Sequence, residues 1–159
     1  MTAQGLFLRA LLAFLALPGI VAFLVPLMVL RGPNEMWRTF HPAGLLALGP
    51  GLILLFVCVR EFYIAGKGTL APWEPPRHLV VSGPYRFSRN PMYVAVLLVL
   101  AGWALGFWSR GLAVYAATLA VVFHLRVILA EEPFLDAAHG EQWRAYKARV
   151  PRWVGPVRS

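Results

Sequence analysis

The sequence predicts an all-α polytopic membrane protein with about four transmembrane helices and a C-terminal interfacial amphipathic helix. Hydrophobic residues make up 59% of the 159 residues, charged residues only 14%, and the mean hydropathy is +0.64. These values lie far from the balance of a soluble globular domain. Four long runs carry no charged side chain, and a polar stretch of helical periodicity follows the last of them.

The four apolar runs approach or reach the roughly 20 residues that cross a bilayer core. They are residues 10–30, 43–59, 91–109 and 111–125. The first is longer than the apolar region of a signal peptide and lacks a small-residue cleavage site, so we expect a membrane helix there, kinked at Pro18 and Pro26. The fourth reaches spanning length when its helix continues through Ala130, which places Arg126 near the membrane boundary.

We expect one integral-membrane domain over residues 1–159. Its parts are the first two spans in 1–64, a cytoplasmic loop in 65–90, the last two spans in 91–130, and a cytoplasmic helix and tail in 131–159. The loop is rich in Pro and Gly, which argues against regular structure. Between residues 134 and 149, apolar side chains recur at helical spacing, so we expect an amphipathic helix at the membrane interface.

The chain is basic, with a formal charge of +8 from 15 Lys and Arg against 7 Asp and Glu. These cations gather in residues 60–89 and from residue 126 onward, whereas the two connections between the other spans hold few. Cytoplasmic loops carry such an excess, so both termini, the loop and the candidate site are expected in the cytoplasm. Membrane lipids explain the charge, and we expect no nucleic acid as a partner.

The stretch GPYRFSRNPMY, residues 83–93, is polar and directly precedes the third apolar run. Asn90 is a good N-cap residue and Pro91 is favoured at the first helical position, so the third span is expected to start here. A helix N-terminus beside Arg86 and Arg89 suits a carboxylate or a phosphate. Alternatively, the helix N-terminus is only capped, and Arg86 and Arg89 only contact lipid head groups.

Glu131 and Glu132 follow the fourth run, where bare acids are costly unless they are paired. The candidate partners are Arg86, Arg89, Arg126 and a cationic ligand. His124 lies two helical turns before Glu131 on the same face, which allows both to line one cavity. Alternatively, the glutamates form an ion pair that only joins the fourth helix to the loop, and His124 is only packed in the interior.

The sequence lacks the residue patterns of several kinds of site. The single cysteine, Cys58, lies inside an apolar run and the four histidines are scattered, so we expect no metal site. No Walker loop, no dinucleotide-binding glycine pattern and no GxSxG turn occurs. The basic and aromatic run of residues 146–153 is typical of an interfacial anchor, or of a tail whose cation folds back to hold an anionic group.

Together, GPYRFSRNPMY and EEPFLDAAHGEQWRAYKARVP (residues 131–151) resemble the isoprenylcysteine carboxyl methyltransferase and phospholipid methyltransferase superfamily of integral-membrane enzymes. The matching positions are Gly83, Pro84, Tyr85, Arg86, Arg89, Pro91, Tyr93, Glu131, Glu132, Gly140, Trp143, Tyr146, Arg149, Val150 and Pro151. Two positions depart from the pattern: Asn90 stands where many members have His, and His139 where they have Phe. Asn hydrogen-bonds and caps but does not titrate near neutral pH.

The resemblance implies transfer of the methyl group of S-adenosylmethionine to a lipophilic acceptor. The expected cofactor-binding residues, with His124 added from its helix position, are Gly83, Pro84, Tyr85, Arg89, Asn90, Tyr93, His124, Glu131 and Glu132. The expected catalytic residues are Arg149, Glu132 and Asn90. Arg149 is expected to hold an anionic group of the acceptor, and alignment and dehydration are expected to contribute more than acid–base chemistry.

Two other functions stay open at this point. One is an NADPH-dependent membrane reductase of the steroid-reductase type, and the other is a non-catalytic membrane protein that binds lipid or a partner. The acceptor also stays open among an isoprenylcysteine carboxylate, a phospholipid amine and a small lipophilic amine, thiol or phenol. Apolar helices with glycines pack within or between chains, so oligomeric state stays open too.

Overall fold

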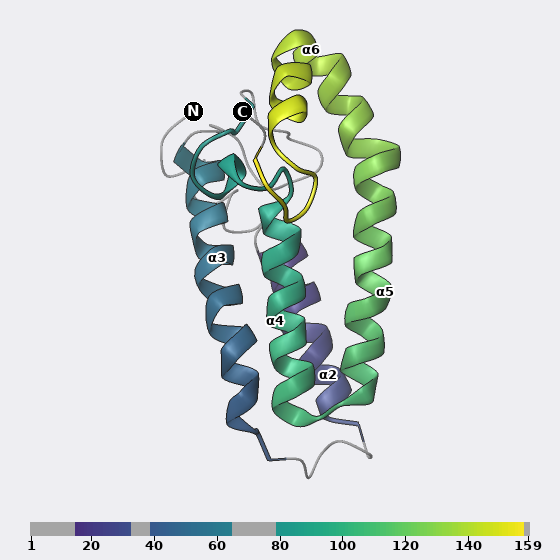
Figure 1. Ribbon diagram of the computed structural model, residues 1–159. Coiled ribbons are helices and arrows are strands. Elements are labelled where there is room, and N and C mark those ends of the chain that lie inside the picture. The colour runs from purple at the N-terminus through teal and green to yellow at the C-terminus, as the bar shows by residue number, and fades with distance from the viewer. Residues whose placement is uncertain (1–14, 33–38, 65–78, 158–159) are drawn as a thin grey trace, which may run out of the picture.

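The computed structural model describes residues 15–32, 39–64 and 79–157 (Figure 1). These residues form helices and contain no strand, so the all-α prediction is confirmed for them. The elements are η1 (Leu15–Leu24), α2 (Val25–Leu30), η2 (Pro42–Gly44), α3 (Leu45–Ile64), η3 (Gly83–Arg86), α4 (Pro91–Phe107), α5 (Arg110–Arg126), η4 (Val127–Glu131) and α6 (Glu132–Arg149). Helices α2, α3, α4 and α5 lie side by side as a bundle (Figure 1).

Two stretches of helix are long and apolar enough to cross a membrane, Pro42–Glu61 and Arg110–Arg149. The other two, Pro18–Leu30 and Pro91–Phe107, are shorter. The start of the first expected span, residues 10–14, lies outside the described residues, as do residues 65–78 of the expected loop. The fourth helix does continue past Arg126 through η4, as expected, and four spans remain a prediction.

Glycines bring α3 and α4 into close contact. A Cβ added at Gly102 would lie 2.6 Å from the backbone nitrogen of Leu48, and one at Gly44 would lie 2.6 Å from the carbonyl oxygen of Gly102. Gly102 and Gly106 are four residues apart on one face of α4, the small-residue spacing that lets helix backbones approach in membranes. Helix α4 therefore holds the centre of the bundle, with Val99 and Leu100 fully buried.

Pro26 determines how the first helix attaches to the bundle. Proline has no N–H, so one carbonyl in the preceding turn loses its helical partner, that of Ala22 with α-helical spacing or that of Val21 with π-helical spacing. Trp103 Nε1 of α4 donates to the Ala22 carbonyl at 3.1 Å, and Tyr115 Oη of α5 donates to the Val21 carbonyl at 3.2 Å. Side chains of two other helices thus donate to carbonyls in the turn before Pro26.

The C-terminal helix is bent. Helix α6 bends at Gly140, where φ is +48° and ψ is −119°. The chain reverses there and returns toward the loop before α4 (Figure 1). The apolar side chains Trp143, Tyr146 and Val150 consequently bury against Leu79 and Leu135 of the same chain. The expected helix over residues 134–149 is thus present within α6, and the sequence did not predict its bend at a glycine, which permits a backbone conformation that other residues avoid.

Replacing Gly140 by Ala is expected to lower the free energy of unfolding by about 1–3 kcal/mol, through backbone strain at positive φ. No atom lies within 4 Å of the position of the added Cβ, so steric overlap does not contribute. Thermal unfolding of the detergent-purified protein measures the effect, and His139→Ala is the neighbouring control. Equal stability of the Gly140 variant and the control would contradict the bend.

Candidate functional site

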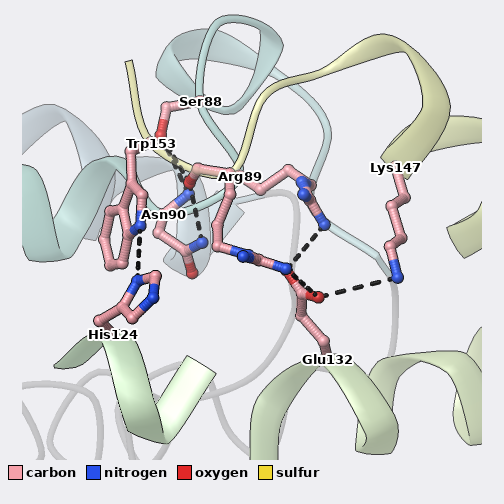
Figure 2. A network of polar contacts seen from close by, with 8 residues as sticks. Ser88, Arg89, Asn90, His124, Glu132, Lys147 and Trp153 are labelled. Carbon is pink, nitrogen blue, oxygen red and sulfur yellow. Dashed lines mark hydrogen bonds and ion pairs between the residues drawn. The ribbon is translucent and has the colours of Figure 1, made fainter. Parts of the chain in front are cut away.

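Three segments distant in sequence meet at one end of the bundle (Figures 1 and 2). They are the loop before α4, the junction of η4 and α6, and the tail after α6. The backbone N–H of Arg89 donates to the Pro151 carbonyl at 2.9 Å, and Tyr146 Oη donates to the Tyr85 carbonyl at 2.7 Å. The return of the chain at Gly140 brings the tail to the loop. These are the same segments that carry the resemblance described above.

Asn90 precedes the helix as expected but does not cap it with its side chain. Helix α4 begins at Pro91, and Asn90 makes no side-chain capping bond. Instead its Nδ2 donates to the Arg152 carbonyl at 3.0 Å, and its backbone N–H donates to Ser88 Oγ at 3.1 Å (Figure 2). The capping prediction was wrong because the tail offers a carbonyl acceptor that no local sequence pattern reveals. Asn90 therefore joins the loop to the tail.

Glu132 is the centre of an ion network (Figure 2). Its carboxylate accepts from Arg89 Nη1 at 2.9 Å and from Arg152 at 2.7 and 3.0 Å, and Lys147 Nζ lies 3.7 Å away. The side chains of Arg89 and Glu132 are only 8% and 9% exposed. Three cations around one carboxylate keep it ionised at neutral pH. The network links the loop, the start of α6 and the tail.

The pKa values of Arg89 and Arg152 shift in opposite directions. Burial lowers the pKa of Arg89, although the adjacent Glu132 carboxylate opposes the change. The hydrogen bond to Glu132 raises the pKa of the more exposed Arg152. Arginine stays protonated across the accessible pH range in either case. Arg89 also lies over Trp143, with its guanidinium carbon 5.5 Å from the ring centroid, which adds a cation–π contact.

Glu131 forms a second cluster with Tyr93 and Arg126. Its Oε1 accepts from the Tyr93 hydroxyl and from Arg126 Nε, the latter at 2.8 Å, and Arg126 Nε also lies 3.1 Å from Tyr93 Oη. No described residue donates to the other oxygen of Glu131. The side chain is 30% exposed, so this oxygen has capacity for a further donor.

Aromatic rings adjoin the Glu131 cluster. Tyr93 stacks on Phe123 with ring centroids 4.4 Å apart, and Trp153 of the tail lies 6.5 Å from Tyr93. Trp153 Nε1 donates to His124 Nδ1 at 3.1 Å (Figure 2). Since an indole N–H only donates, His124 accepts through Nδ1 in this arrangement. Trp153 thus contacts both His124 and Tyr93, and the expectation that His124 and Glu131 line one cavity stays a prediction.

Other predicted site residues lie elsewhere. Gly83, Pro84 and Tyr85 form η3 at the end of α3, and Tyr85 buries in a cluster with Cys58. Burial raises the pKa of Tyr85 well above its usual value, so its phenol is neutral. Arg149 is exposed and its Nε donates only locally, to the Ala145 carbonyl at 3.4 Å. Among the described residues, no hydrogen bond joins Gly83, Pro84 or Arg149 to the Glu131 cluster, whereas the Glu131 charge contributes to the raised pKa of Tyr85.

The sequence prediction missed three contributors to this end of the bundle. Arg152 and Trp153 come from the tail, and Glu61 accepts from Ser82 Oγ at 2.5 Å and so holds the start of the loop. The only signal was the basic, aromatic character of residues 146–153, which also suited a membrane anchor. The expected partners of the paired glutamates were right for Arg89 and Arg126, and the described contacts give none for Arg86.

Fold and site together define a helical membrane-associated protein with a polar site at one end of its bundle. The family model of the phospholipid methyltransferases matches residues 40–142, well over half of the chain. The chain therefore belongs to the phospholipid methyltransferase family. This confirms the resemblance carried by the loop and by the paired glutamates.

Individual relatives match shorter stretches. The chain is 43% identical over 76 residues to the cobalt-zinc-cadmium resistance protein CzcN of Cupriavidus metallidurans, covering 46% of this chain and 33% of that protein. It is 34% identical over 74 residues to the methanethiol S-methyltransferase of Crocosphaera subtropica, covering 44% of this chain and 26% of that protein. An uncharacterised protein of Haemophilus influenzae is 35% identical over 63 residues, which are 40% of this chain and all of that protein.

The matched stretch thus covers about a third of the length of CzcN and about a quarter of the length of the methanethiol S-methyltransferase. No solved structure matches the chain.

Proposed function

We propose that the protein transfers a methyl group from S-adenosylmethionine to a lipophilic acceptor at the cytoplasmic face of a membrane. One observation supports this most directly: the loop, the paired glutamates and the tail, which carry the family resemblance, meet at one end of the bundle. Family membership and the similarity to a methanethiol S-methyltransferase support methyl transfer as the reaction class.

The residues around Glu131 fit the chemistry of the cofactor. S-Adenosylmethionine supplies an electrophilic methyl on a sulfonium, and carries an ammonium, a carboxylate and an adenine. The open oxygen of Glu131 suits the ammonium or the sulfonium, and the rings of Tyr93 and Trp153 suit a cation or adenine. Arg89 is our candidate for the carboxylate, because its buried Nε has no acceptor among the described residues.

Glu132 and Asn90 act on this site through the elements they hold together. Glu132 pairs with Arg89 and Arg152, and Asn90 bonds the tail, so both set where the loop and tail lie relative to Tyr93. Neither offers a titrating base near neutral pH in these contacts. Displacement of a methyl from a sulfonium needs alignment and exclusion of water more than proton transfer. Arg149, exposed and without an acid among the described residues, is our candidate for an anionic group of the acceptor.

The remaining parts of the proposal concern topology and acceptor. We propose four spans in one domain, with both termini and the site cytoplasmic, following the distribution of Lys and Arg. The acceptor class is a lipid or a small amphiphile, and a thiol is included because one relative is named for methanethiol.

Binding of S-adenosylmethionine to the detergent-purified protein tests the proposal. Glu131→Gln is expected to weaken binding by about tenfold or more, since a charge-assisted contact contributes roughly 1.5–3 kcal/mol. Glu141→Gln, whose side chain is 90% exposed, is the matched control and should bind like wild type. Titration calorimetry gives the affinities, and thermal unfolding verifies that each variant is folded.

NADPH titration separates the competing functions. Binding of NADPH without S-adenosylmethionine by folded protein would favour the membrane reductase. Binding of neither would favour a non-catalytic membrane protein. A labelled methyl group transferred from S-adenosylmethionine into an organic-extractable product would identify the acceptor.

A further inference from the structure

The contact between Trp153 and His124 joins the tail to α5 in one protonation state of His124. Trp153 Nε1 donates to His124 Nδ1 at 3.1 Å, and the two ring centroids lie 6.0 Å apart (Figure 2). An indole N–H only donates, so Nδ1 must carry no hydrogen and the imidazole must be neutral. Protonation makes both ring nitrogens donors, which would place the N–H of His124 against the N–H of Trp153.

No described carboxylate pairs with His124. The imidazole is exposed near the end of α5, and no described hydrogen bond or ion pair joins it to an acid. Glu131 is the acid closest to it along the chain, and Glu131 already accepts from Arg126 and from Tyr93. The charged and titratable side chains nearest this pair in the described contacts are Tyr93 of α4, Arg126, Glu131 and, beside Trp153, Arg152. A proton on His124 would therefore remove the bond to Trp153 without a described carboxylate to compensate it.

The tail is held firmly just before Trp153, so the loss of this bond would have a local effect. The Arg152 carbonyl accepts from Asn90 Nδ2 at 3.0 Å, and the Arg152 guanidinium pairs with Glu132 (Figure 2). Neither contact involves His124. Residues 154–157, which follow Trp153, are exposed. The indole would consequently be free to move while the backbone at Arg152 stays in place.

The indole of Trp153 lies beside the polar site. Its ring centroid is 6.5 Å from that of Tyr93, whose hydroxyl donates to Glu131. In the proposed function, Trp153 and Tyr93 are the two rings that suit a cation or adenine. A movement of the indole would thus change the surroundings of Glu131 and leave the ion network of Glu132 intact.

We propose that His124 is a positioning residue: its neutral imidazole holds the Trp153 indole beside Tyr93, and its protonation releases this indole. His124 thereby acts through Trp153, without itself contacting the cofactor. The consequence for cofactor binding rests on the proposed function, whereas the release of the indole does not.

NMR of the indole N–H groups tests the release in the detergent-purified full chain, with isotope-labelled tryptophan. The Trp153 resonance is the one that disappears in Trp153→Phe. It should move in a one-proton transition between about pH 8 and pH 5, the range in which histidines change charge. In His124→Asn, the amide oxygen replaces Nδ1 as a non-titrating acceptor, so the resonance should stay constant. His139→Asn removes another imidazole and is the matched control, which should titrate like wild type.

Titration calorimetry at the same two pH values measures the effect on S-adenosylmethionine binding. Wild type and His139→Asn should bind about fivefold more weakly at the lower pH, the effect of one hydrogen bond. His124→Asn should lose this pH dependence, and its comparison with wild type removes any titration of the ligand itself. Thermal unfolding at both pH values verifies that each protein is folded, since a purely structural role would appear there.

Three outcomes would overturn the proposal. A wild-type Trp153 resonance that does not change with pH would show that the indole is not released. A resonance that titrates equally in His124→Asn would place the proton on another group. A resonance that responds as expected, with an affinity independent of pH, would show that His124 does not position the site. If none of the folded proteins binds S-adenosylmethionine, the proposed function fails, and the NMR measurement still decides whether the indole is released.

Discussion

Replacing Glu132 by Gln is expected to lower the free energy of unfolding by about 3–5 kcal/mol, the cost of breaking a buried ion pair on one side. Gln keeps the shape of the side chain but removes the charge. Arg89 would then be a buried cation with no carboxylate beside it, and Arg152 and Lys147 would repel it. The tail would then be held to the loop by the remaining contacts, among them the hydrogen bonds of Arg89, Asn90 and Tyr146.

Cys58 offers a direct measurement of this loss. It is the single cysteine of the chain, and it lies on α3, fully buried against Val80 and Tyr85. A thiol-reactive fluorophore therefore reports unfolding as temperature rises. Glu141→Gln is the control, since a surface ion pair contributes at most about 1 kcal/mol. A Glu132 variant that unfolds with the control would show that the network contributes little.

Gly102→Ala is the second substitution with a large expected effect. A single methyl group at this position would overlap the backbone of Leu48, whose nitrogen and Cα would lie 2.6 and 2.7 Å away. Backbone cannot rotate aside as a side chain can, so α3 and α4 must separate. We expect the free energy of unfolding to fall by about 2–3 kcal/mol, the cost of overpacking a close interface.

Gly49→Ala provides the same chemical change without the overlap. Gly49 lies in α3, and no atom lies within 4 Å of its added Cβ. Alanine favours helix over glycine, while Pro50 disfavours helical backbone at a preceding residue with a Cβ, so this control should be about as stable as wild type. Folded yield after purification and Cys58 labelling compare the two variants. Equal yields would mean that α3 and α4 do not pack at Gly102.

The helices could largely be predicted from the sequence because uncharged runs of this length have few other solutions. Helix α4 begins at Pro91 as the Asn-Pro step indicated, and the chain stays helical past the end of α5 at Arg126, through η4. The bend at Gly140 could not be predicted, since a lone glycine in a helical pattern is tolerated as often as it ends a helix. Its effect arises from Trp143 and Tyr146 burying against the loop, which is a tertiary contact.

The candidate site, too, could be predicted from the sequence only in part. The pairing of Glu131 and Glu132 with arginines followed from the cost of unpaired charge near a membrane. The choice of Arg152 as a partner did not, because it depends on the tail folding back. Asn90 illustrates the limit of local rules: its neighbours predict a cap, and the Arg152 carbonyl takes its side chain instead.

The carbonyls of Val21 and Ala22 have a consequence for how the first helix is oriented. Surrounded by lipid and apolar side chains, a helix gains little from one rotation about its axis over another, or from one depth over the next. The bonds from Trp103 and Tyr115 come from two different helices and reach two successive carbonyls. They select one rotation and one depth. The turn before Pro26 thus decides which side of the first helix faces α4 and α5.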